Sequence, residues 1–279
     1  MFSMGTPQEI TGMTDSRKVD LLRLYFDEPF HVTKDITIYV PTVQDIINFG
    51  EDEFWSVVNI FIANTTTFRL PLWEAGIDWN KISDFQLFGM LVKHVEPSKS
   101  SILFGDIDFT KFEMLAREPV VDESADPNLE VSPELILYSD EQDIVITEED
   151  YNLIALYIRT MFGMFPKVEK AKGKATKQAI IDEDKMNREN KKDDDDSSSI
   201  LLPLISSCLN HPGFKYKKNE LREVGIVEFM DSVQRLQVYE STTALLKGIY
   251  SGMVDAKDID AEEFNFMREI KSNKNKNKK

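Results

Sequence analysis

The sequence predicts an α+β fold that is mainly helical, with a helical body and a small antiparallel β component in short hairpins. Apolar residues recur at spacings of three and four in several long segments, which is typical of amphipathic helices. Strict alternation of apolar and polar residues is confined to short runs, which indicates few and short strands. With 279 residues and 42% hydrophobic content, the chain can form one large domain or two smaller ones with a real core.

The first predicted unit is a strand and helix unit over residues 1–95. Residues 1–18 are mostly polar, so we expect a loosely ordered start. Val19–Phe26 is apolar enough to be a strand or a short helix. Asp35–Val40 alternates apolar and polar residues, and we expect it to pair with Phe30–Val32 as a hairpin.

Two capping patterns mark helix starts in this unit. Thr42 is followed three residues later by Asp45, so its hydroxyl can accept a hydrogen bond from an unpaired amide of the first helical turn. Gly50 is expected to divide this helix from a second one. Ser83, with Gln86 three residues on, predicts another helix by the same pattern.

These segments carry a family resemblance. Lys34–Ile46, which reads KDITIYVPTVQDI, resembles the opening of the tail assembly chaperones of tailed bacteriophages, where a short strand ends in a Pro-Thr-Val-x-Asp-like helix start. Gly76–Phe85 is similar to the turn and capped helix of that family. The resemblance covers about a quarter of the 279 residues and points to the Firmicute-type siphophages or prophages.

Residues 96–147 are predicted to be a β-rich insert, because several prolines punctuate short apolar runs. Ser101–Phe104 is expected to be a strand, and Phe109–Leu115 a helical turn. Val121–Val131 is acidic and predicts a loop. Leu135–Ile146 has two apolar runs around a polar five-residue stretch, which is typical of a hairpin.

The second half is predicted to be helical. Residues 148–192 form a helical segment that begins at a cap on Thr147, and residues 193–199 are an acidic and serine-rich linker. Residues 200–270 are a C-terminal helical unit, and residues 271–279 a disordered basic tail. We expect the N-terminal and C-terminal helices to pack as one body, with the small sheet at its side.

Charge and cysteine content restrict the partners. The net charge of −16 disfavours nucleic acid and anionic membranes, and favours a basic or amphipathic protein partner. The single cysteine fits a reducing cytosol. No run approaches the roughly 18 apolar residues that a membrane helix needs, so no membrane is expected as a partner.

No recognisable catalytic, cofactor or metal motif is present, and we expect no enzyme activity and no cofactor. Ala171–Thr176 contains Gly-Lys but lacks the leading glycine and the hydroxyl of a phosphate-binding loop. His31, His94 and His211 lie in three different predicted elements, although zinc needs three or four converging ligands. Cys208 is interpreted as a small core residue.

The candidate partner-binding residues are aromatic. Large aromatic side chains dominate both protein cores and interfaces, and they are crowded between residues 54 and 88. Most are expected in the core. The candidates for a partner surface are Trp55, Trp73, Trp79 and Phe88, and Trp55 is the foremost because it lies off the apolar face of its predicted helix.

The resemblance implies a cytoplasmic tail assembly chaperone, which binds the tape measure protein and helps to recruit tail tube subunits during virion morphogenesis in the host cytoplasm. The alternative is a virion structural protein of the neck, tail or baseplate. An enzyme with a site assembled from distant residues is the third hypothesis. The sequence does not fix the oligomeric state, and a homo-oligomer is compatible with it.

Overall fold

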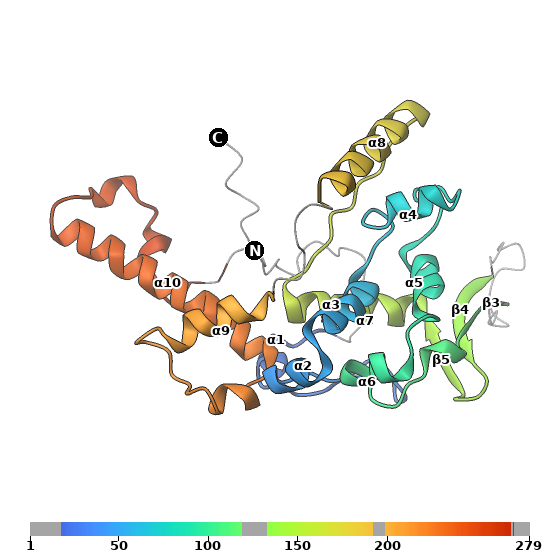
Figure 1. Ribbon diagram of the computed structural model, residues 1–279, viewed down its shortest axis with the longest axis horizontal. Helices are drawn as coiled ribbons and strands as arrows, with labels where there is room; N and C mark the ends of the chain where they lie inside the picture. Colours follow the sequence, from blue (N-terminus) through green and yellow to red (C-terminus); the bar gives the residue numbers. More distant parts are fainter. Residues whose placement is uncertain (1–17, 119–132, 192–198, 269, 271–279) are drawn as a thin grey trace, which may run out of the picture.

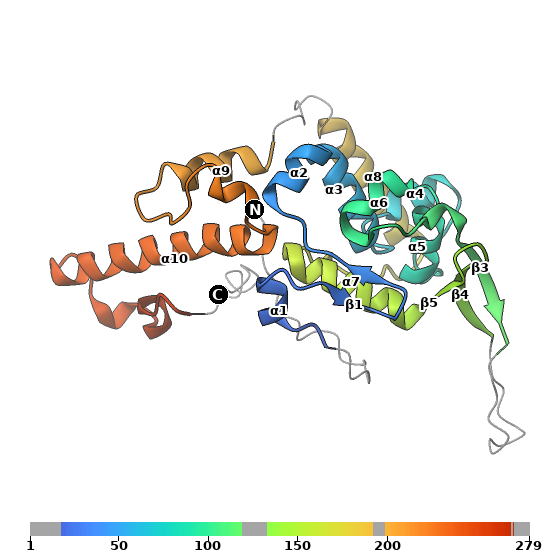
Figure 2. The ribbon, with the colours of Figure 1, turned by 90° about the horizontal axis from the view of Figure 1, so that it is seen from below.

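The computed structural model describes residues 18–118, 133–191, 199–268 and 270. Within them the chain is mainly helical with two small antiparallel sheets, as the sequence predicts. Figure 1 and Figure 2 show α7 (Glu148–Phe162) in the body, with α10 (Ile226–Tyr250) extending from one end and the larger sheet at the other. Four predicted segments lie wholly or mostly outside the described residues: the loosely ordered start at 1–18, the acidic loop at 121–131, the linker at 193–199 and the basic tail at 271–279.

The N-terminal elements follow their local sequence signals. After α1 (Leu21–Tyr25), the predicted hairpin is confirmed as β1 (Phe30–His31) paired with β2 (Thr37–Ile38). Thr42 and Asp45 form a reciprocal capping box at the start of α2 (Val43–Phe49). Gly50, with φ of 99°, separates α2 from α3 (Glu51–Ile62), as predicted.

The middle of the chain differs in part from the prediction. After α4 (Arg69–Glu74), the predicted Ser83 capping box starts α5 (Asp84–Val92). The strand predicted at Ser101–Phe104 is wrong, because these residues complete α6 (Pro97–Phe104). This helix has Pro97 in its first turn, and Gly105 is its C-cap. A short apolar run of this kind does not distinguish a strand from a buried helix end.

The predicted hairpin at residues 135–146 is confirmed within a three-stranded sheet. The order is β3 (Glu113–Arg117), β4 (Glu134–Ser139) and β5 (Ile144–Thr147), all antiparallel. The helical turn predicted at Phe109–Leu115 is only partly correct. It is the 3-10 turn η2 (Phe109–Lys111), and β3 begins two residues later.

The C-terminal elements are α8 (Lys174–Lys191), α9 (Leu201–Leu209), η3 (Glu220–Glu223), α10, η4 (Ala256–Asp258) and η5 (Ala261–Phe264). Among them, α8, η3 and α10 contact N-terminal elements, whereas η5 packs on α10. The main core contains side chains from all four long predicted units: Phe54, Leu137, Ile154 and Phe229. Backbone hydrogen bonds from Val43 N–H to Val224 O and from Ile226 N–H to Pro41 O join the start of α2 to the start of α10.

Glu51 joins the N-terminal and C-terminal parts of the chain at a second place. Its carboxylate accepts hydrogen bonds from the backbone N–H groups of Ile200 at 2.7 Å and Leu201 at 2.8 Å, and from the Ser199 hydroxyl. The first N–H groups of a helix have no intrahelical partner, so this carboxylate caps α9 and faces the positive end of its dipole.

Asp27 lies where α1 meets α10, in a strained position. Its φ is 56°, and its Oδ1 is buried without a hydrogen-bond partner among the described residues. A Cβ on Gly225, the residue before α10, would lie 2.0 Å from this oxygen, so any other residue there would displace the Asp27 carboxylate. Burial, together with the nearby Glu228 carboxylate, raises the pKa of Asp27 to about 6.

We expect Glu51→Ala to lower the free energy of unfolding by about 1 to 2 kcal/mol, because two amides of α9 lose their acceptor. Asp52→Ala is the matched control, since Asp52 also lies in the first turn of α3 but is exposed. Urea denaturation of both variants measures the difference. Equal loss in both would contradict the capping role.

We expect Asp27→Asn to stabilise the protein at pH 7 by about 1 to 2 kcal/mol after allowance for solvent screening. Because folding raises the pKa of the Asp27 carboxyl, its protonated form contributes stability at pH values below the unfolded-state pKa near 4. This contribution is lost as the pH rises through the folded-state pKa of about 6. The variant should therefore match the wild type at about pH 4 and exceed it at pH 7. Thermal denaturation against pH measures this, with exposed Asp106→Asn as the control.

Candidate partner-binding site

Trp55 and Phe88, two of the four predicted partner-binding residues, lie in the main core. The exposed fraction is 8% for Trp55 and 1% for Phe88. The expected exposure of Trp55 is wrong, because α3 buries a wide arc and the Trp55 ring packs against Phe54 and Phe162. In this conformation these two rings stabilise the core and present no surface to a partner.

Trp73 and Trp79 lie in a separate, smaller apolar cluster. Their rings meet edge to face at 5.8 Å. Trp79 is 2% exposed and Trp73 is half-buried. In this conformation other parts of the chain cover Trp79, so its ring presents almost no surface to a partner. We call this group the satellite cluster, and its buried members are Ala63, Leu70, Leu72, Trp79, Leu87, Ala171 and Ile181.

The satellite cluster is covered by α8, which lies beside α4 at the edge of the body (Figure 1). Ile181 is buried and Ile180 is half-buried, whereas most other described side chains of α8 are exposed. These two isoleucines are the apolar contribution of α8 itself to the cluster. The helix is therefore amphipathic, with a narrow apolar face.

Ion pairs flank this narrow apolar face. Lys177 donates to Asp78 and lies 5.6 Å from the centre of the Trp79 ring. At the other end of α8, Arg188 donates to both carboxylate oxygens of Glu74, the closer at 2.7 Å. The hydrogen bond from Lys177 lowers the pKa of Asp78, which keeps that carboxylate charged.

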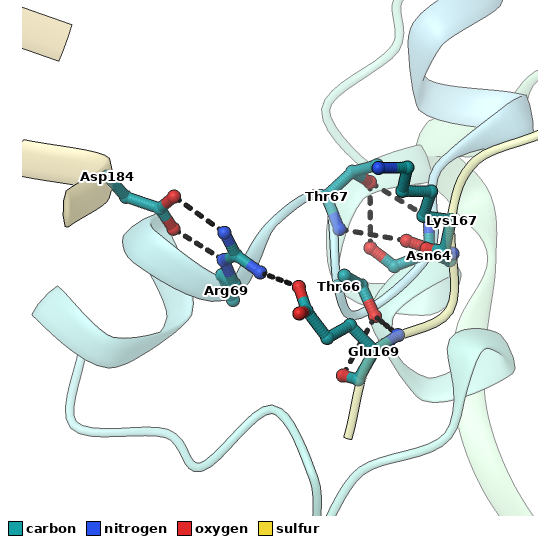
Figure 3. Close-up of polar contacts among 7 residues, drawn as sticks. All are labelled: Asn64, Thr66, Thr67, Arg69, Lys167, Glu169 and Asp184. Atoms are coloured by element: carbon teal, nitrogen blue, oxygen red, sulfur yellow. Dashed lines mark hydrogen bonds and ion pairs between the residues drawn. The ribbon is translucent and has the colours of Figure 1, made fainter. Parts of the chain in front are cut away.

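Arg69, in the first turn of α4, pairs with two carboxylates (Figure 3). Its guanidinium donates two hydrogen bonds to Asp184 of α8 and a third, at 2.6 Å, to Glu169. The side chains of Arg69 and Asp184 are only 18% and 20% exposed. A partly buried, bidentate pair of this kind is stronger and more specific than a surface ion pair.

The chain that leads to α8 is held by side-chain hydrogen bonds from the loop after α3. The Asn64 amide donates to Lys167 O at 2.8 Å, and the Thr66 hydroxyl accepts from Glu169 N–H at 3.0 Å (Figure 3). Farther along, the Asn80 amide donates to Ala171 O at 2.7 Å. These contacts fix the backbone up to residue 171, so they position the start of α8 next to the satellite cluster.

The sequence did not indicate the pairing of α8 with α4. Lys177, Ile181, Asp184 and Arg188 recur at spacings of three, four and seven, which places them on one helix face. That pattern was a usable signal for an amphipathic helix. It carried no information about Arg69, Glu74 or Asp78, which lie about a hundred residues earlier in the chain.

The residues considered for chemistry lie apart. His31 contacts Thr37, His211 pairs with Glu240, and Cys208 is 3% exposed in the main core. Across the part of the chain that is described, no group of three or more His, Cys, Asp or Glu side chains could hold a metal ion. None of the described helices combines the length and the apolar content that a membrane span requires.

Comparison with protein-family models, with curated proteins and with solved structures gave no match.

We expect Asp184→Ala to speed hydrogen exchange of the α8 amides about tenfold, because the bidentate partner of Arg69 is lost and α8 opens more often. Hydrogen exchange with mass spectrometry measures the effect, and the amides of α7 should be unchanged. Glu183→Ala is the matched control, since this neighbour is exposed on the same helix. Similar exchange in both variants would contradict the role of the ion pair.

Proposed function

We propose that the chain is a non-catalytic binding protein for a helical segment of another protein. The observation that carries this proposal is the satellite cluster, where aromatic and aliphatic side chains already accommodate an amphipathic helix between charged residues. Grooves that bind helices in other proteins use the same combination of apolar anchors and flanking charges. The net charge of −16 favours a partner with basic residues.

Within that class, we propose a tail assembly chaperone of a Firmicute-type siphophage or prophage. The partners would be the tape measure protein and the tail tube protein, in the host cytoplasm. The resemblance of Lys34–Ile46 and Gly76–Phe85 to that family supports the assignment, and both segments form the strand, turn and capped helices that the resemblance implies. A long helical chain that exposes apolar stripes needs such a partner to stay soluble.

A virion structural protein is the second candidate, and the three-stranded sheet favours it. Among the described residues β3 is an edge strand at the end of the body, and Leu115 on it is 43% exposed. Exposed edge strands pair with strands of other chains in assemblies.

Co-expression with the tape measure protein of the same phage or prophage tests the chaperone. We expect the soluble fraction of the tape measure protein to rise several-fold and both proteins to co-purify. Equal insolubility with and without this chain would refute the proposal. Mass spectrometry of purified particles separates the candidates, because a structural protein is retained in them and a chaperone is absent.

A further inference from the structure

The attachment of α8 differs from that of the other long helices. Among its described side chains only Ile181 is buried, whereas α7 buries ten of its 15 residues. Most of the stability of a helix in a protein comes from the packing of its apolar face, so α8 depends on its contact with the satellite cluster. Three ion pairs also hold it: those to Arg69 and Asp78 are partly buried, and the pair between Arg188 and Glu74 is exposed, so salt screens the last most.

The surface under α8 does not belong to the main core. Trp79, Leu70 and Ile181 form the satellite cluster, whereas the side chains around α7 form a different cluster. Release of α8 would therefore expose an aromatic groove without opening the main core. Gly173, which precedes α8 with φ of 88° and open space at its Cα, allows the chain to turn there.

We propose that α8 is an internal occupant of a helix-binding groove, and that the partner is a basic amphipathic helix that competes with α8 for it. The identity of the partner protein rests on the function proposed above, but the competition does not. The groove is lined by Leu70, Leu72 and Trp79, and its charged rim consists of Asp78, Glu74 and Arg69.

The contacts of α8 specify what the partner must carry. Lys177 and Arg188, eleven residues apart, meet the two rim carboxylates, so a partner needs a basic residue at each of these positions. Asp184 between them meets Arg69, so the partner also needs an acidic residue there. Ile180 and Ile181 follow Lys177 by three and four residues, so a pair of branched apolar residues is required there. The negative charge of the chain disfavours acidic helices in the same groove.

A labelled peptide with the sequence of residues 174–191 tests the competition, because it carries the required pattern and can be added to the full chain. Its binding to the wild type should be weak, since the groove is occupied for most of the time. Ile181→Asp and Asp184→Ala in the full chain loosen α8 from the groove. We expect either variant to bind the peptide about tenfold more tightly than the wild type does, measured by fluorescence anisotropy.

Three controls make the result specific. Glu183→Ala in the full chain should bind the peptide as the wild type does, since its side chain is exposed. A peptide in which the residue that corresponds to Ile181 is aspartate should bind none of the chains. Circular dichroism must give the same main unfolding transition for all variants, which shows that the main core is intact.

Equal affinity of the peptide for the wild type and both loosened variants would overturn the proposal, and so would the absence of binding to all of them. This outcome is separate from failure of the proposed function. Peptide binding without rescue of the tape measure protein would leave the groove in place and assign it a different partner. Rescue without peptide binding would retain the chaperone and place its contact elsewhere on the chain.

Discussion

The burial of α7 on nearly all sides is the constraint on which the rest of the structure depends. It contacts α3, α5, α10 and β5, and its buried residues include Tyr151, Ile154 and Ile158. The polar side chains of such a buried helix still need hydrogen-bond partners. Arg159 donates to Ile62 O at 2.8 Å and to Ala63 O at 3.0 Å, and therefore satisfies carbonyl groups at the end of α3 that have no intrahelical partner.

The same contact determines where α8 can lie. Arg159 fixes the end of α3, and the turn that follows holds Lys167 through Asn64. Hydrogen bonds therefore determine the path of the chain up to the start of α8. Beyond that point, ion pairs and the packing of two isoleucines hold α8 in place. Stability is not uniform across such a structure, and segments with few buried apolar contacts open first. The geometry thus combines a rigid support with a weakly held helix.

The sequence predicts the parts of this fold that local chemistry decides. The caps at Thr42, Ser83 and Thr147 were predictable because the two partners lie three residues apart, and all three form. The burial of Trp55 was not predictable, since it depends on a ring contributed by α7. The cap of α9 by Glu51 was not predictable either, because nothing in the sequence near Glu51 indicates contact with a helix that begins 150 residues later.

An internal occupant gives the groove two properties that an open groove lacks. An exposed aromatic groove is an aggregation hazard, and in the proposed arrangement α8 shields the groove until a partner binds. It also sets a threshold, because the apparent affinity of any partner is reduced by the fraction of time for which the groove is occupied. A partner that meets Asp78, Glu74 and Arg69 as α8 does passes this threshold, whereas a helix that offers only apolar residues loses the competition to α8.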